Sequence, residues 1–170
     1  MKITKPTTSN GWLDRYIKQV DNDDLLLELD DLRDTTVALY SSLTREQLVF
    51  RYAPGKWSIA ELLVHVMDTE RIFSYRALRF ARLDDTPLPG FDENLLVQNS
   101  RADQRPLEAL LDEYNASRQA SIALYSGFDT AALDAYGIAN GTTQSVRAIG
   151  FAQCGHERHH LRIIHERYLS

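Results

Sequence analysis

Apolar residues recur every three or four positions in four long segments of the chain, which is the period of an amphipathic helix. The segments span about residues 24–42, 59–83, 106–126 and 146–169. No stretch shows a convincing run of the alternating pattern that is typical of a strand. The pattern therefore predicts an all-α protein, and four such segments favour an antiparallel-type four-helix bundle.

Short polar motifs indicate where these helices begin. Ser58 and Glu61 match a capping box at the start of the second helix, and Thr44–Gln47 matches another for one brief extra turn. Asp23 and Ser145 have side chains suited to the N-caps of the first and last helices. These motifs predict helix starts near residues 24, 59 and 146.

Shorter features fill the segments between the helices. Trp12–Val20 predicts a short helix before the bundle, and Asp129–Leu133 predicts one further turn. Tyr136–Thr143 contains two glycines and is expected to be a loop, whereas residues 1–11 are expected to form a loosely held arm. Asp84–Asp103 has no clear period and is long enough to cross from one end of the bundle to the other.

The composition bounds the class of protein. The chain has 170 residues, of which 44% are hydrophobic and 25% charged, and we expect one domain over residues 1–170. Its net charge of −5, without a basic stripe, argues against a nucleic-acid partner. The single cysteine, Cys154, cannot form an intrachain disulfide and fits a reducing compartment. No apolar run has transmembrane length and no signal-peptide core is visible, so we expect a cytoplasmic protein without a membrane partner.

The last helical segment carries the clearest candidate chemistry. His156 and His160 are four residues apart, so in a helix they lie on one face, one turn apart, and can bind one divalent metal ion. Both fall on the apolar stripe that includes Ile149 and Ala152, where polar groups need partners. A metal ion is one possible partner and ordinary hydrogen bonds are another. The spacing alone leaves both open.

Four further residues have to be weighed beside this pair. His65 flanks the apolar stripe of the second long helix, and that helix alone indicates a boundary histidine. His159 lies at the edge of the stripe, where a hydrogen-bonded histidine is the simpler interpretation and a fourth ligand or proton shuttle the alternative. His165 points to the opposite side and is expected to be exposed. Cys154 lies off the ligand face, which indicates a buried packing residue rather than a nucleophile.

Three motifs in this order resemble the DinB-like family, the DNA-damage-inducible, metal-dependent four-helix bundles. They are Tyr-Ala-Pro-Gly-Lys-Trp-Ser at 52–58, His-Val-Met-Asp-Thr-Glu-Arg at 65–71 and Gly-His-Glu-Arg-His-His at 155–160. The similarity spans nearly the whole chain, including Thr-Pro-Leu-Pro-Gly-Phe at 86–91. The resemblance implies up-down-down-up connectivity, and frequently a homodimer.

The resemblance also implies a divalent metal bound by His65, His156 and His160. Nickel or zinc suits three imidazoles, and manganese or iron is compatible with them. Because three protein ligands leave the ion open to water or substrate, the set is typical of a catalytic site rather than a structural one. The resemblance therefore revises the interpretation of His65 from a boundary residue to a ligand.

Two classes of function follow from the resemblance. The first is a metal-dependent transferase or hydrolase that acts on a small molecule, with thiol-cofactor S-transfer as one form and a low-molecular-weight thiol as a partner. The alternative is a non-catalytic stress-response dimer that binds a metal or ligand. Histidines that bind no metal at all are a third interpretation.

Other polar residues near the expected site have an ordinary interpretation beside a functional one. Asp68 and Glu61 lie three and four residues from His65, so either carboxylate can orient the ring or simply face solvent. Arg71, Arg76 and Arg79 can attract an anionic substrate or simply form a solvated basic face. Tyr52, Lys56 and Trp57 can line a pocket mouth, although Trp57 is also explained as a hydrophobic staple at the start of the helix.

Overall fold

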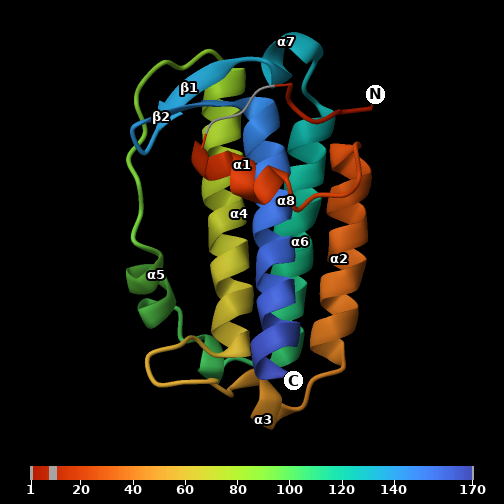
Figure 1. Ribbon diagram of the computed structural model, residues 1–170, viewed down its shortest axis with the longest axis vertical. Coiled ribbons are helices and arrows are strands. Elements are labelled where there is room, and N and C mark those ends of the chain that lie inside the picture. The colour runs from red at the N-terminus through yellow and green to blue at the C-terminus, as the bar shows by residue number, and fades with distance from the viewer. Residues whose placement is uncertain (1, 8–10, 170) are drawn as a thin grey trace.

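The structure is a computed structural model that describes residues 2–7 and 11–169. Four long helices form a bundle (Figure 1). They are α2 (Leu25–Ser41), α4 (Ile59–Ala81), α6 (Leu107–Ser126) and α8 (Val146–Ile163). Each lies in one of the four segments with a helical apolar period, which confirms the predicted all-α four-helix bundle.

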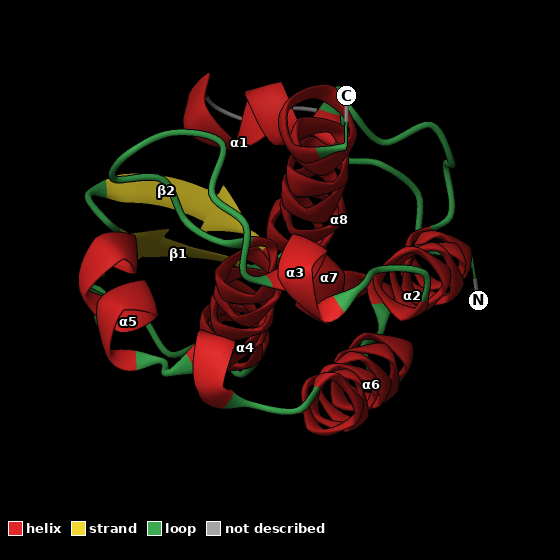
Figure 2. Cartoon of the chain, turned by 90° about the horizontal axis from the view of Figure 1, so that it is seen from below, coloured by secondary structure: helices red, strands yellow, loops and turns green. Residues whose placement is uncertain are grey.

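The order of the helices around the bundle places α4 next to both α6 and α8 (Figure 2). Helix α2 completes the ring by packing against α6 and α8, so α2 and α4 lie on a diagonal. Helices α4 and α6 run in one direction and α2 and α8 in the other, which is the expected up-down-down-up connectivity (Figure 1). The two helices from which the candidate ligands come are therefore antiparallel neighbours.

The long connection after α4 returns the chain to the opposite end of the bundle, as predicted (Figure 1). It contains α5 (Glu93–Asn99) and a 3₁₀ helix at Ala102–Gln104, neither of which the sequence pattern predicted. Helix α5 has seven residues, and its one buried residue is Val97. A helix of two turns with one buried residue has too few apolar positions to show a period.

Short elements decorate the bundle. Helix α1 (Gly11–Ile17) packs across α8 and α3 (Arg45–Leu48) follows α2, while α7 (Thr130–Leu133) is the predicted extra turn after α6. The remaining element is an antiparallel hairpin of β1 (Tyr136–Ala139) and β2 (Thr142–Ser145). None of the described helices has the length and apolar character needed to cross a bilayer.

The prediction of a loop at Tyr136–Thr143 was wrong, because this segment forms most of the hairpin. Asn140 and Gly141 connect its strands with φ values of 50° and 72°, the positive-φ pair that an Asn-Gly hairpin turn requires. Ala139 also forms a parallel bridge with Leu88, so the hairpin is joined to the connection after α4. The hairpin and this connection together form one wall of the candidate site.

Most predicted helix ends are confirmed, with small corrections. Both capping boxes are present, and Ser145 caps α8. The N-cap of α2 is Asp24 rather than Asp23, because the Asp24 carboxylate accepts the Leu26 N–H whereas Asp23 accepts the Lys5 N–H. The last helix ends earlier than predicted, and a π-helical turn continues it over Ile164–Tyr168.

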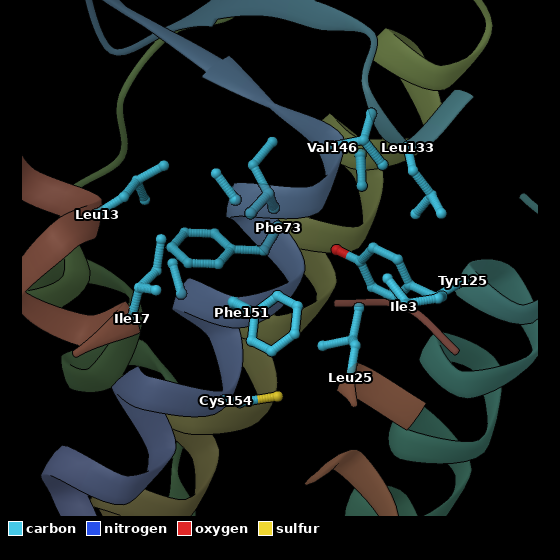
Figure 3. Packing of buried hydrophobic residues seen from close by; sticks show 14 of the residues in the cluster. Ile3, Leu13, Ile17, Leu25, Phe73, Tyr125, Leu133, Val146, Phe151 and Cys154 are labelled. Atoms are coloured by element: carbon cyan, nitrogen blue, oxygen red, sulfur yellow. The ribbon is translucent and has the colours of Figure 1, made fainter. Parts of the chain in front are cut away.

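The core extends along the bundle in two adjoining clusters. Figure 3 shows the first, in which Phe73, Tyr125 and Phe151 pack between the helices and Cys154 points into the same core. Ile3 belongs to this cluster and is 1% exposed, and its carbonyl accepts the Leu25 N–H. The chain around Ile3 is therefore packed rather than loose, while residues 1 and 8–10 of the expected arm lie outside the described residues.

Candidate metal centre

Helices α4 and α8 bring three histidines together. His65 projects from the second turn of α4, and His156 and His160 project from α8 one turn apart. The Nε2 atoms of His65 and His156 are 3.0 Å apart, and those of His160 and His156 are 3.1 Å apart. The three donor nitrogens lie within 4.8 Å of one another.

These distances suit ligands of one metal ion. With metal–nitrogen bonds of about 2.0–2.1 Å, two imidazole nitrogens lie about 3.0 Å apart at a right angle and about 3.4 Å apart at the tetrahedral angle. The observed separations of 3.0 and 3.1 Å match the lower end of that range. Three imidazole nitrogens are also a donor set that zinc, nickel and iron accept. The residues present therefore fit a divalent ion.

Burial keeps the three imidazoles neutral. It lowers the pKa of His65 to about 4. Burial and then the neighbouring imidazoles hold the pKa values of His156 and His160 well below their usual range. A neutral imidazole can offer a ring nitrogen lone pair, so all three side chains are in the ligating form at neutral pH.

Aromatic rings hold the histidines in place. The Trp57 ring lies 4.7 Å from that of His65, and the Tyr16 ring lies 5.4 Å from that of His156. Tyr16 reaches α8 because Gly155 has no side chain, since a Cβ there would lie 1.9 Å from the Tyr16 carbonyl oxygen. Gly155, the residue directly before His156, therefore allows α1 to pack closely against the site.

The structure does not bring the expected carboxylates to His65. Glu61 accepts the Ser58 N–H and pairs with Arg51 at 2.8 Å, and Asp68 pairs with Arg71 at 3.4 Å. Of the two interpretations of Glu61 and Asp68, the structure supports the ordinary one, because helix capping and surface ion pairs engage both carboxylates.

A buried ionic cluster lies next to the candidate ligands, and sequence reasoning missed it. The Arg118 side chain donates to Glu70 at 2.9 and 3.1 Å and also forms an ion pair with Glu157, the residue after His156. The Tyr114 hydroxyl donates to Glu157 at 2.6 Å. The signal in the sequence was the occurrence of charged residues on otherwise apolar helix faces.

A cavity of about 480 Å³ opens over the three histidines. It lies among α1, α4, α8, the hairpin and the connection after α4. Its walls combine aromatic, hydroxyl, amide and guanidinium groups, from Trp12, Trp57, Thr69, Arg76, Phe91 and Gln144. Its size is within the usual range of small-molecule sites, and its mixed lining can both exclude water and orient a ligand.

Of the three arginines expected to form a basic face, only Arg76 lines this cavity. Arg71 pairs with Asp68 and with Glu113, and Arg79 pairs with Asp84. The three guanidinium groups therefore do not act together.

The three residues expected at a pocket mouth differ in which cavity they line. Trp57 lines the cavity over the histidines and also a neighbouring cavity of about 250 Å³, which Tyr52 and Lys56 line as well. His160 borders both cavities. Trp57 therefore contributes to the cavity over the histidines, whereas Tyr52 and Lys56 line only the neighbouring one.

The other histidines and the cysteine lie as expected. His159 is partly buried at the cavity wall, where the Arg162 guanidinium lies 3.3 Å from its Nδ1. His165 is exposed. Burial raises the pKa of the Cys154 thiol well above its usual range, which makes it a poor nucleophile.

Comparison with known proteins identifies the family. The sequence model of the DinB superfamily matches residues 28–164, which include all three histidines. The chain belongs to the DinB superfamily. The resemblance seen in the three sequence motifs is thereby confirmed, and no curated protein matches the chain.

Two solved structures share the fold of this DinB superfamily member. One is YfiT from Bacillus subtilis, which is described as a probable metal-dependent hydrolase with an unusual four-helix bundle topology. It aligns with a TM-score of 0.69 and 16% sequence identity, and the alignment covers 95% of this chain and 90% of YfiT. The mycothiol-dependent maleylpyruvate isomerase aligns with a TM-score of 0.65 and 12% identity over 78% of this chain and 56% of its own. At these identities the likeness shows the fold.

Proposed function

We propose that this protein is a metal-dependent enzyme that acts on a small molecule, with a divalent ion held by His65, His156 and His160. One observation carries the proposal. Three neutral imidazoles from two helices direct their Nε2 atoms to one point, beside a cavity large enough for a small substrate. A site built only to tie helices together would need no such cavity.

A divalent ion held by three imidazoles supplies Lewis acidity, so that it can lower the pKa of a water molecule or bind a thiolate. The chain's own residues supply the rest. Trp12, Trp57 and Phe91 limit the access of water to the cavity and offer apolar surface to a ligand. His159 is at the cavity wall and partly exposed, so its ring can exchange a proton with a bound molecule.

Two classes of reaction are supported by the relatives that share the fold. One relative is described as a probable metal-dependent hydrolase and the other as a mycothiol-dependent isomerase. Both classes would need the Lewis acidity that an ion held by His65, His156 and His160 would supply. We infer that the substrate is a small molecule and that a low-molecular-weight thiol is a candidate co-substrate.

Several narrower expectations stay predictions. Nickel or zinc is the expected ion, a homodimer the expected assembly, and the cytoplasm the expected location. Light scattering of the purified chain tests the homodimer, and fractionation of cells tests the location.

The test of function compares metal-loaded and metal-free protein prepared without a histidine tag. The stripped protein is reloaded with zinc, nickel, manganese or iron(II) and assayed with ester and amide substrates, and with cysteine or glutathione plus chlorodinitrobenzene. We expect turnover by the loaded protein, and its loss with chelator and in His160→Ala. His165→Ala, which changes an exposed histidine of the same C-terminal segment, should remain active.

The alternative of a non-catalytic protein predicts a different result. Loaded wild-type protein would then bind the ion but show no more turnover than His160→Ala on any substrate. That outcome would leave the metal centre in place and overturn the enzymatic part of the proposal.

A further inference from the structure

Arg76 is a buried cation at the wall of the cavity. Its side chain is 3% exposed, and it forms no ion pair within the described part of the chain. One nitrogen, Nη2, donates to the Pro89 carbonyl oxygen at 3.0 Å. A guanidinium has five N–H groups, so most of its donors are left for another partner.

Two aromatic rings position this guanidinium. Its Cζ atom lies 5.8 Å from the centre of the Phe73 ring and 5.7 Å from that of Phe91. Phe73 precedes Arg76 by three residues on α4, so the side chain leans back toward the helix N-terminus and hence toward His65. The Phe73 ring also lies 6.4 Å from that of His156. A single ring thus neighbours both the cation and the metal centre.

The charge of Arg76 is not balanced by the protein around it. Burial lowers the pKa of this guanidinium, because no neighbouring carboxylate offsets the loss of water. Glu93 lines the same cavity but is exposed and forms no ion pair with Arg76. Arg118, which is also buried, is instead paired with two carboxylates. An unpaired buried charge is costly, so a cation kept in this state indicates a ligand that neutralises it.

Thr69 offers a second polar group between Arg76 and the histidines. Its Oγ1 atom is buried and has no hydrogen-bond partner among the described residues, although the residue lines the cavity. Thr69 follows His65 by four positions and precedes Arg76 by seven, so all three lie on one strip of α4. The strip presents an imidazole, a hydroxyl and a guanidinium in sequence.

We propose that Arg76 binds the carboxylate of a small organic acid, with the Thr69 hydroxyl as a further donor and the reactive end of the acid at the three histidines. A carboxylate matches one planar guanidinium in charge and in bidentate geometry. The position of the reactive end rests on the proposed function. The binding of the carboxylate by Arg76 does not, since it requires no metal.

The test uses 3-phenylpropionate and its neutral isostere 3-phenylpropionamide as probes of metal-free protein. Trp12 and Trp57, the two tryptophans of the chain, both line the cavity, so binding is read from tryptophan fluorescence. We expect the acid to bind roughly tenfold or more tightly than the amide. Arg76→Met, which keeps an apolar stem beside Phe73, should abolish this preference, and Arg76→Lys should retain part of it.

Arg79→Met is the matched control, because Arg79 is one turn further along α4 and pairs with Asp84 outside the cavity. It should bind both probes as the wild type does. Equal binding of acid and amide by wild-type protein would overturn the proposal. This comparison needs no variant, so it remains decisive even if Arg76→Met fails to fold.

The metal is assayed separately, so that the two proposals can fail independently. Arg76→Met should bind the same amount of metal as wild type. The preference for the acid could instead appear only in metal-loaded protein and persist in Arg76→Met. That result would show that the carboxylate binds at the histidines, and it would contradict the role of Arg76. Absence of metal with the acid preference intact would overturn the proposed function alone.

Discussion

The Nε2 atoms of His65 and His156 lie 3.0 Å apart, although the two residues are 91 positions apart in the chain. A neutral imidazole carries one proton, so two such nitrogens can share at most one hydrogen bond. His160 places a third Nε2 atom 3.1 Å from that of His156. One hydrogen bond therefore uses only two of the three Nε2 atoms that face this point, whereas a divalent ion would bind a lone pair from each.

The buried histidines should make the metal-free protein sensitive to acid. The pKa of His65 is about 4 in the folded chain and 6.5 in the unfolded chain, so below pH 6.5 the unfolded state binds more protons. Stability should therefore be unaffected above pH 6.5, fall between pH 6.5 and about 4, and fall no further from this cause at lower pH. For His65 alone the loss is about 3 kcal/mol.

Urea unfolding in the presence of a chelator, at a series of pH values, measures this effect. His65→Leu should show a shallower loss of unfolding free energy between pH 6.5 and 4 than wild type. His165→Ala, at an exposed position, should follow the wild-type curve. Parallel curves for His65→Leu and wild type would mean that His65 is not held neutral by the fold.

Arg118 should be the most costly charged residue to replace. Its guanidinium pairs with Glu70 and Glu157, and all three side chains are at most 2% exposed. Arg118→Met leaves both carboxylates buried without their cation, and we expect a loss of about 3–5 kcal/mol in unfolding free energy. Replacing Glu70 and Glu157 with glutamine in the same chain should recover much of it.

The control for Arg118 is an arginine on the surface. Arg33 pairs with Asp30 at 2.9 Å and is partly exposed to solvent. Arg33→Met should change the unfolding free energy by less than about 1 kcal/mol. If Arg118→Met and Arg33→Met lose the same unfolding free energy, the cluster around Arg118 does not stabilise the fold.

Gly155→Ala should displace α1 from the bundle. The added Cβ would lie 1.9 Å from the Tyr16 carbonyl oxygen, and backbone cannot yield as a flexible side chain does. We expect a loss of at least about 1–3 kcal/mol in unfolding free energy, with a change in the fluorescence of Trp12 on α1. At Gly127, where a Cβ would meet its nearest atom at 3.5 Å, Gly127→Ala should change stability by less than about 1 kcal/mol. Wild-type stability in Gly155→Ala would show that α1 does not pack as described.

Much of the architecture could be predicted from the sequence because long amphipathic helices repeat their signal over many turns. The apolar periods and the capping box at Ser58 located the bundle helices, and the length of the connection after α4 allowed the crossover. The hairpin was missed, although its Asn140-Gly141 turn is a strong local signal, because each strand has only four residues. Helix α5 was missed for the same reason of length.

The site was predictable only in part. The spacing of His156 and His160 was visible in the sequence, whereas His65 could be joined to them only through the family resemblance. The cavity depends on how α1, α5 and the hairpin fold over the bundle, which no local pattern encodes. Arg76 likewise could not be distinguished from Arg71 and Arg79. The three arginines differ only in their neighbours, and those neighbours come from distant parts of the chain.

The most direct test of the metal centre is the metal content of untagged protein after equilibrium dialysis against zinc or nickel, measured by elemental analysis. We predict about one ion per chain for wild type and for His165→Ala, and far less than one for His65→Ala, His156→Ala and His160→Ala. Wild-type protein that binds no ion, or ligand variants that bind as much as wild type, would contradict the metal centre.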